Sequence, residues 1–144
     1  MTMAHPTQES LLEANQQFYE AFETLNTDHM TRLWEESDRV YCVHPGWNPI
    51  QGYDKVVRSF QQIFSQTGAI HFSLSIGHAH LLDTLGVVTL VENVISQTAD
   101  DPISAAAATT NLFGFDPSSG LWKIFHHHSS ILVANPAFPA DVLN

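Results

Sequence analysis

The chain has 144 residues, 44% of them hydrophobic, which is enough to build one globular domain, residues 1–144, around an apolar core. Asp and Glu number 15 against 5 Lys and Arg, and the resulting formal charge of −10 opposes binding to nucleic acids or anionic membranes. The single cysteine cannot form an internal disulfide, and no apolar run is long enough to cross a membrane. We therefore expect a cytoplasmic protein without nucleic-acid or membrane partners.

A first helix is predicted over residues 8–25. Thr7 is a suitable N-cap because its hydroxyl can accept a hydrogen bond from the first turn, in which Glu9 follows. Apolar residues then recur with helical spacing, so that one face of the helix can be buried. They are Leu11, Phe18, Phe22 and Leu25.

Two further helices are predicted in the first half of the chain. The shorter one begins at Thr27 or Asp28, either of which can act as its N-cap, and it ends near Ser37. The longer one runs over residues 53–66, where apolar residues again form a stripe, and Gly68 is expected to end it in a left-handed conformation.

Beyond the third helix, apolar and polar residues alternate, as they do in half-buried β-strands. Strands are predicted over residues 39–43, 70–76, 78–82, 86–98, 103–115 and 121–133. Turn-rich segments separate the later ones, among them Asp100-Asp101-Pro102. Helices first and strands afterwards indicate an α+β fold. We expect a cystatin-like cone, in which three N-terminal helices pack on a curved, mainly antiparallel sheet and leave a tapered interior.

Three consecutive histidines lie in the last predicted strand. Strict alternation places His126 and His128 with Ile124 on the interior face and His127 on the outside. Two imidazoles on one strand face would need a third ligand, such as His44, to hold a metal ion. Because cysteine ligands and a helical HxxxH pair are missing, we expect no metal and no other cofactor.

Other residues are candidates for lining a ligand pocket. Glu92 stands in the apolar run VVTLVENVI, and its pKa should rise if its side chain faces the interior. The aromatic residues of the helices could equally form the core, and the histidines could be packed strand residues. The candidates are Phe18, Trp34, Trp47, Phe60, Phe64, Glu92, Asn111 and His126.

The run Ala105-Ala-Ala-Ala108 predicts a flat strand surface that another subunit can approach closely. Cys42 lacks a flanking positive charge, so we expect a small buried apolar residue and no nucleophile. We expect a homodimer that forms through the exposed face of the sheet.

Two motifs, together with this order of elements, resemble the nuclear-transport-factor-two-like superfamily, which includes ketosteroid isomerases and SnoaL-like cyclases. They are Val43-His44-Pro45-Gly46-Trp47 and GLWKIFHHHSS. The segments Ile70-His71 to His78-Ala-His80 and Gly120-x-Trp122 to His126-x-His128-x-Ser130 are most similar to a bacterial branch of it. That branch resembles the association domain of calcium/calmodulin-dependent protein kinase type two.

The resemblance implies roles for particular positions. The general base of ketosteroid isomerases precedes a proline, which matches His44 before Pro45. Their helix-one tyrosine matches Phe18, which has no hydroxyl, while the adjacent Tyr19 is expected to point elsewhere. The arginine of the kinase association domain matches Asn111, which weakens the case for a carboxylate ligand.

Two functions therefore remain open. The first is a conical pocket that binds an unidentified, mostly apolar small molecule, with His44 and His128 catalysing proton transfer of the isomerase, dehydratase or cyclase type. The second is a non-catalytic oligomerisation module with a filled interior.

Overall fold

The structure, a computed structural model, describes residues 4–97 and 102–133. Its elements follow the predicted order, helices before long strands. They are α1 (Gln8–Glu23), α2 (Thr27–Leu33), β1 (Tyr41–Val43), β2 (Ile50–Gln51), α3 (Tyr53–Gln66), β3 (Ala69–Leu82), β4 (Leu85–Gln97), β5 (Pro102–Asp116) and β6 (Leu121–Ile131).

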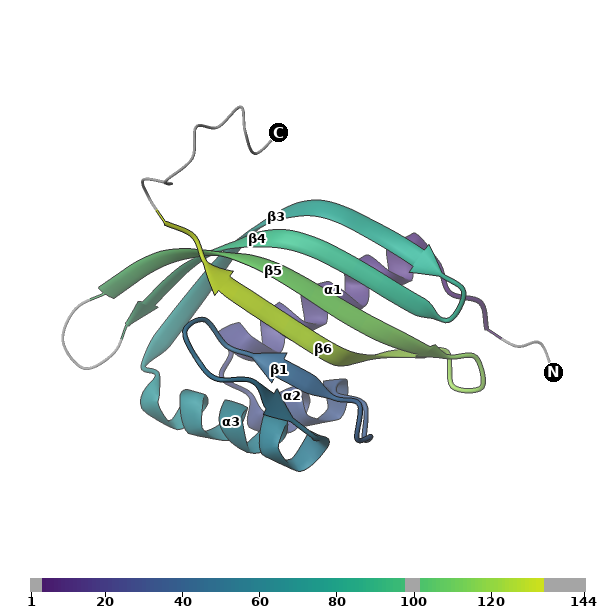
Figure 1. Cartoon of the computed structure of the whole chain (residues 1–144), viewed down its shortest axis with the longest axis horizontal. Coiled ribbons are helices and arrows are strands. Elements are labelled where there is room, and N and C mark those ends of the chain that lie inside the picture. Colours follow the sequence, from purple (N-terminus) through teal and green to yellow (C-terminus); the bar gives the residue numbers. More distant parts are fainter. Residues whose placement is uncertain (1–3, 98–101, 134–144) are drawn as a thin grey trace.

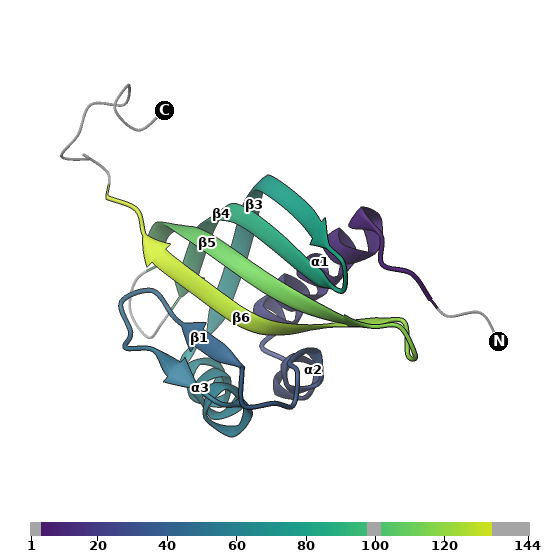
Figure 2. The ribbon, with the colours of Figure 1, turned by 45° about the vertical axis from the view of Figure 1, so that its right-hand side comes forward.

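The described strands form one six-stranded sheet in the order β2-β1-β6-β5-β4-β3. All neighbouring strands are antiparallel except β1 and β6, which are parallel. Figure 1 shows the four long strands arching over α1, and the turned view in Figure 2 places α2 and α3 on the same side, below β1. The predicted α+β cone of three helices on a curved, mainly antiparallel sheet is confirmed.

The start of α1 is capped as predicted. The Thr7 hydroxyl accepts a hydrogen bond from the Ser10 backbone N–H at 3.0 Å, and the Ser10 hydroxyl completes a capping box. For α2, the prediction of Thr27 or Asp28 is wrong by one residue. The cap is Asn26, whose Oδ1 accepts from the His29 N–H at 3.0 Å while its own backbone stays extended.

The end of α2 and the conformation of Gly68 after α3 differ from the sequence prediction, whereas α3 ends at Gln66 as predicted. Helix α2 stops at Leu33 because Trp34 adopts an extended backbone and forms a parallel bridge with Ile124. Gly68 is not left-handed, since Thr67 ends α3 in an extended conformation. A Cβ at Gly68 would lie 3.1 Å from the Gln97 carbonyl oxygen, so its small size serves a close approach of two chain segments.

The strand boundaries show two further differences. The segments predicted as 70–76 and 78–82 are one strand, β3, whose pairing with β4 is irregular at Gly77. The two-residue strand β2 was not predicted. The Asp100-Asp101 turn lies outside the described residues.

Aromatic side chains dominate the core between the sheet and the helices. Phe18 and Phe22 of α1 contact Phe60 of α3 with ring centroids 6.0 and 5.6 Å apart, and Phe22 contacts Phe72 of β3 at 4.8 Å. Edge-to-face pairs of this kind contribute beyond their buried area. Within the described residues, no helix is long and apolar enough to span a lipid bilayer.

Candidate functional site

The alternation of inward and outward side chains along β6 is interrupted at Phe125. Ile124 pairs with Phe113 and His126 with Leu112, so Phe125 is an extra residue that forms a β-bulge. Ile124 is 0% exposed and His127 is 2% exposed, although regular alternation would place residues three apart on opposite faces.

The predicted orientation of the three histidines is therefore wrong. His127 faces the interior, whereas His126 and His128 lie on the outer face of the sheet. There His126 stacks on Tyr41 of β1 with ring centroids 5.0 Å apart. His128, predicted as catalytic, and His126, predicted as a pocket residue, do not belong to the interior site.

His127 is the centre of a buried polar cluster. Its Nδ1 lies 2.6 Å from Oδ1 of Asn111, and its Nε2 lies 3.3 Å from the Ser129 hydroxyl. Because Oδ1 only accepts, Nδ1 carries the proton and donates it to Asn111. The Asn111 amide in turn donates to Asn15 at 2.9 Å and to the Tyr19 hydroxyl at 3.3 Å. Asn111 thus joins β6 to α1 and orients His127.

A carboxyl group stands beside this chain of hydrogen bonds. The Tyr19 hydroxyl donates to Oε2 of Glu92 at 2.5 Å, and Ser129 donates to Oε1 at 3.4 Å. Glu92 is buried, and burial raises the pKa of its carboxyl group, as expected for a side chain that faces the interior. Burial, followed by the nearby Glu92, also raises the pKa of Tyr19 well above its ordinary range. The Tyr19 hydroxyl therefore remains a proton donor.

Tyr19 points in a different direction from Phe18, as expected, but it is buried in the interior as well. Helix α1 is covered on two sides, so adjacent residues of it are both fully buried. Phe18 packs on Phe60 of α3, and Tyr19 packs on Phe72 of β3 with ring centroids 5.1 Å apart. A hydroxyl from the first helix is therefore present in the interior.

His44 follows β1 and is also buried. Its Nε2 lies 2.9 Å from the Ser59 hydroxyl, which itself donates to the Val56 carbonyl oxygen at 2.6 Å. Since Ser59 has only one proton, His44 must donate from Nε2, and its Nδ1 carries the lone pair. Burial lowers the pKa of His44 to about 4, so the ring is neutral at pH 7 and Nδ1 can accept a proton.

The parallel pairing of β1 with β6 brings His44 and His127 together, with ring centroids 6.4 Å apart. Burial, followed by the nearby His44, lowers the pKa of His127 well below its ordinary value, so both rings are neutral. Cys42 on β1 is fully buried, and burial raises the pKa of its thiol. The prediction that Cys42 is a buried, unreactive residue agrees with this environment.

Most of the predicted aromatic pocket residues are core residues. The sequence is also compatible with these aromatic residues forming the core, and this alternative holds for the buried Phe18, Trp34, Phe60 and Phe64. Trp47 is 41% exposed and covers His44 from outside, with ring centroids 4.9 Å apart. Among the buried side-chain nitrogen and oxygen atoms of the described residues, only Nε1 of Trp34 has no hydrogen-bond partner.

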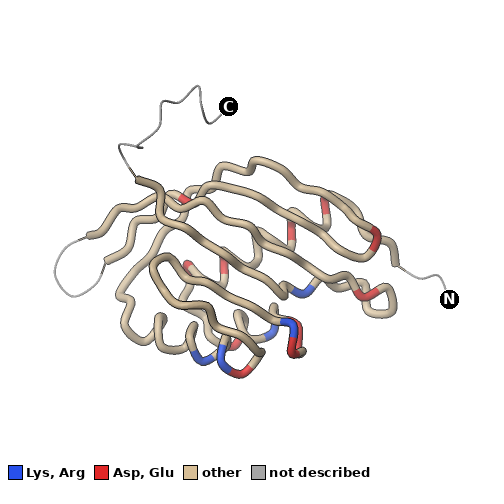
Figure 3. The backbone as a smooth tube through the Cα atoms, viewed as in Figure 1, with Lys and Arg blue, Asp and Glu red and all other residues tan. Residues whose placement is uncertain are grey.

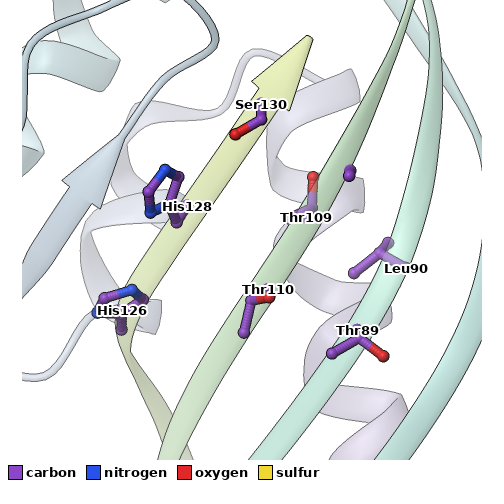
Figure 4. Close-up of a pocket in the computed structure, with 8 residues that line it drawn as sticks. Thr89, Leu90, Thr109, Thr110, His126, His128 and Ser130 are labelled. Carbon is purple, nitrogen blue, oxygen red and sulfur yellow. The ribbon is translucent and has the colours of Figure 1, made fainter. Parts of the chain in front are cut away.

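Two hollows of the described structure lie on its surface next to the histidines. One of about 380 Å³ reaches Ser59, the partner of His44, and is bordered by Trp47. Another, of about 520 Å³, lies on the outer sheet face (Figure 4), where His126 and His128 stand beside Thr110. In the described part of the chain, no three His, Cys, Asp or Glu side chains converge as metal ligands.

A curved sheet over three helices, with a polar cluster inside, defines the class as a nuclear-transport-factor-two-like (NTF2-like) cone, and comparisons with known proteins agree. The SnoaL-like domain matches residues 11–134, so the chain belongs to the SnoaL-like family of this superfamily. The structure of a candidate dehydratase of the NTF2-like family from Streptomyces avermitilis is 32% identical, with a TM-score of 0.80 over 88% of this chain and 96% of that chain.

Two other similar proteins have names that indicate roles other than that of a dehydratase. A candidate calcium/calmodulin-dependent protein kinase type II association domain from Thiobacillus denitrificans is 24% identical, with a TM-score of 0.72 over 90% of this chain and 98% of that chain. The F-box protein SKIP8 of Arabidopsis thaliana is 26% identical over 129 residues, which are 90% of this chain and 52% of that protein. The chain thus spans about half the length of this curated relative.

Proposed function

We propose that the protein binds a small molecule beside His44, at the surface hollow that reaches Ser59, and transfers a proton on it, in a reaction of the isomerase or dehydratase type. The observation that carries the proposal is the pair of neutral imidazoles, His44 and His127, 6.4 Å apart in a buried polar cluster. A neutral imidazole has a lone pair that can accept a proton when it lies within hydrogen-bond reach of the substrate.

The roles follow from the hydrogen bonds. His44 accepts the proton at Nδ1, because Nε2 is held by Ser59. Tyr19, with its raised pKa, stays protonated and donates to Glu92, so it holds that carboxyl group in place beside the histidines. Asn111 fixes the orientation of the His127 ring by accepting a hydrogen bond from its Nδ1. His44 remains from the predicted catalytic pair, and His127 replaces His128.

The free-energy cost of burying this polar cluster supports a functional role for it. A buried polar group that loses its partner costs about 1–3 kcal/mol, and an apolar core of the same volume avoids that risk. The unpartnered Nε1 of Trp34 also offers a donor to a ligand acceptor. The candidate dehydratase that is 32% identical supports the same reaction class.

Hydrogen–deuterium exchange at the carbon next to a ketone tests this proposal. The probe is 2-tetralone in D₂O, followed by proton NMR with wild-type protein, His44→Asn and His128→Asn. We expect His44→Asn to lose about 100-fold or more of the protein-dependent rate, because a general base contributes at least that much. His128→Asn, on the outer face, should exchange at the wild-type rate. Equal rates in wild type and His44→Asn would refute the role of His44.

We also propose that two copies pair through the outer sheet face, which preserves the predicted homodimer. This face carries neutral side chains at its centre, such as Thr89, Thr110 and His126 (Figure 4), while the whole chain carries a charge of −10. Two copies of an acidic protein repel each other least where their surfaces are uncharged. The similarity to an association domain supports an oligomer, and the acidic composition with one cysteine supports a cytoplasmic location.

A further inference from the structure

The hollow outside His44 is built by one face of α3 and by the chain before it. Lys55, Arg58, Ser59 and Gln62 follow one another at helical spacing, so their side chains share a face. Trp47 and Ile50 form the opposite wall. The hollow therefore combines an indole ring, two cations and two neutral polar groups.

The two cations are unusual in this chain. There are only 5 Lys and Arg against 15 Asp and Glu, yet 2 of the 5 line this one hollow. Figure 3 shows blue segments along α3. In the described part of the chain, the one ion pair of a Lys or Arg joins Arg39 to Glu35, so neither Lys55 nor Arg58 has a carboxylate within 4.0 Å.

Acidic residues near these cations belong to a different hollow. Glu36, Asp38 and Asp54 line the neighbouring hollow, which Lys55 and Arg58 also border. The wall formed with Trp47 contains no carboxylate among the described residues. Nε of Arg58 donates to the Asp54 backbone carbonyl oxygen at 3.4 Å. This bond holds the inner side of the guanidinium group against the helix, and the two terminal nitrogens can still donate to a ligand.

This hollow lies next to the proposed catalytic side chain, His44, and is separated from it by Ser59 and Trp47. Ser59 lines it and is hydrogen bonded to Nε2 of His44 at 2.9 Å. Trp47, which packs on the His44 ring, separates that ring from the outside. A ligand that displaces the Trp47 indole would reach His44 while its outer end still lay between Lys55 and Arg58.

We propose that the ligand is an aromatic carboxylate, whose anionic group binds Lys55 and Arg58 at the mouth while its uncharged part passes Trp47 towards His44. Guanidinium and ammonium groups bind carboxylates through charge-assisted hydrogen bonds, and an indole packs on a flat ring. The inference rests on the proposed function and gives its ligand class. It replaces the mostly apolar ligand expected from the sequence. That expectation considered only the neutral Asn111 as a possible partner for a carboxylate.

A matched pair of probes tests the proposal, 2-naphthylacetate and its neutral amide, 2-naphthylacetamide. Their dissociation constants are measured by quenching of tryptophan fluorescence at low salt, with wild type, Lys55→Gln/Arg58→Gln and Arg32→Gln. We expect wild type to bind the carboxylate at least about ten-fold more tightly than the amide. The double variant should lose this preference and still bind the amide. Arg32→Gln, which removes an exposed charge at the end of α2, should keep the preference.

Three results would overturn the ligand class. They are equal affinities of wild type for both probes, a preference that survives Lys55→Gln/Arg58→Gln, and no binding of 2-naphthylacetate at millimolar concentration. The proposed function fails separately, if His44→Asn exchanges deuterium into 2-tetralone as fast as wild type. A lost preference in the double variant together with normal exchange in His44→Asn would leave the anion site valid and remove the catalytic role.

Discussion

Glu92 illustrates which site residues a single sequence can reveal. A carboxylate within the apolar run VVTLVENVI is conspicuous, and the raised pKa expected for an interior position accompanies its burial. Asn111 was recognised as a pocket position only through a family resemblance. Tyr19 and His127 were missed, because their burial depends on which neighbours cover them and not on their own type.

Replacing Glu92 with Gln should change how stability depends on pH. An acid whose pKa is raised in the folded state holds a proton that the unfolded chain has released, so its contribution to stability falls as pH rises. The decline begins near the ordinary pKa of 4.5 and continues through the raised value. We expect Glu92→Gln to be more stable than wild type by about 1 kcal/mol at pH 8 and similar at pH 4.5.

Urea unfolding at both pH values measures this difference. Gln keeps an oxygen that accepts from Tyr19, so the hydrogen bond to α1 is retained. Glu36→Gln, at an exposed position, is the matched control and should give no gain at pH 8. A Glu92→Gln variant that is less stable than wild type at pH 8 would mean that the ionised carboxylate stabilises the fold.

His44 should produce the opposite dependence at lower pH. A base whose pKa is lowered by burial contributes stability above its unfolded pKa, and this contribution is lost as pH falls from the ordinary 6.5 towards about 4. We expect the His44 ring signals in NMR to show no titration between about pH 7.5 and 5.5. An inflection near pH 6.5 would show that the ring is hydrated and would contradict its assignment as a buried neutral base.

At the scale of elements, periodicity predicted the helices and the long strands, but it could not reveal the bulge in β6. Trp122 and Ile124 mark the interior face, and from residue 126 to residue 130 the strand contains only His and Ser. These residues are compatible with either face, so hydrophobicity gives no sign that Phe125 is the extra residue. Only the pairing of β6 with β5 defines its position.

The start of α2 gives a sharp test at this scale, because Asn26 and Thr27 are adjacent and both are favourable N-cap types. Asn26→Ala removes the side chain that accepts from His29 and should destabilise the protein by about 1 kcal/mol. Thr27→Ala should cost less than half as much, because the Thr27 side chain makes no described capping bond. Chemical denaturation measures both, and a reversed order would place the cap at Thr27.

At the scale of the whole molecule, charge and apolar surface are separated. The described strands β3 to β6 carry their few charged residues in the interior or near strand ends, as Glu92, Asp116 and Lys123. The middle of the outer face is left to Val, Thr, Ala and His, and Ala106 and Ala108 leave it flat. An acidic chain with one neutral, flat face is suited to pairing with a second copy through that face.

Thr110→Arg should convert the proposed dimer to a monomer. Thr110 lies between His128 and Thr89 in the sheet and borders the outer hollow, so an arginine here would place two like charges in the interface between copies. Sedimentation velocity at micromolar concentration should give about twice the chain mass of 16.0 kDa for wild type and the single mass for Thr110→Arg. Gln61→Arg, on the exposed side of α3, adds the same charge and should remain dimeric. Circular dichroism establishes independently that the variant is folded. A monomeric wild type, or a dimeric Thr110→Arg, would show that the outer face is not the interface.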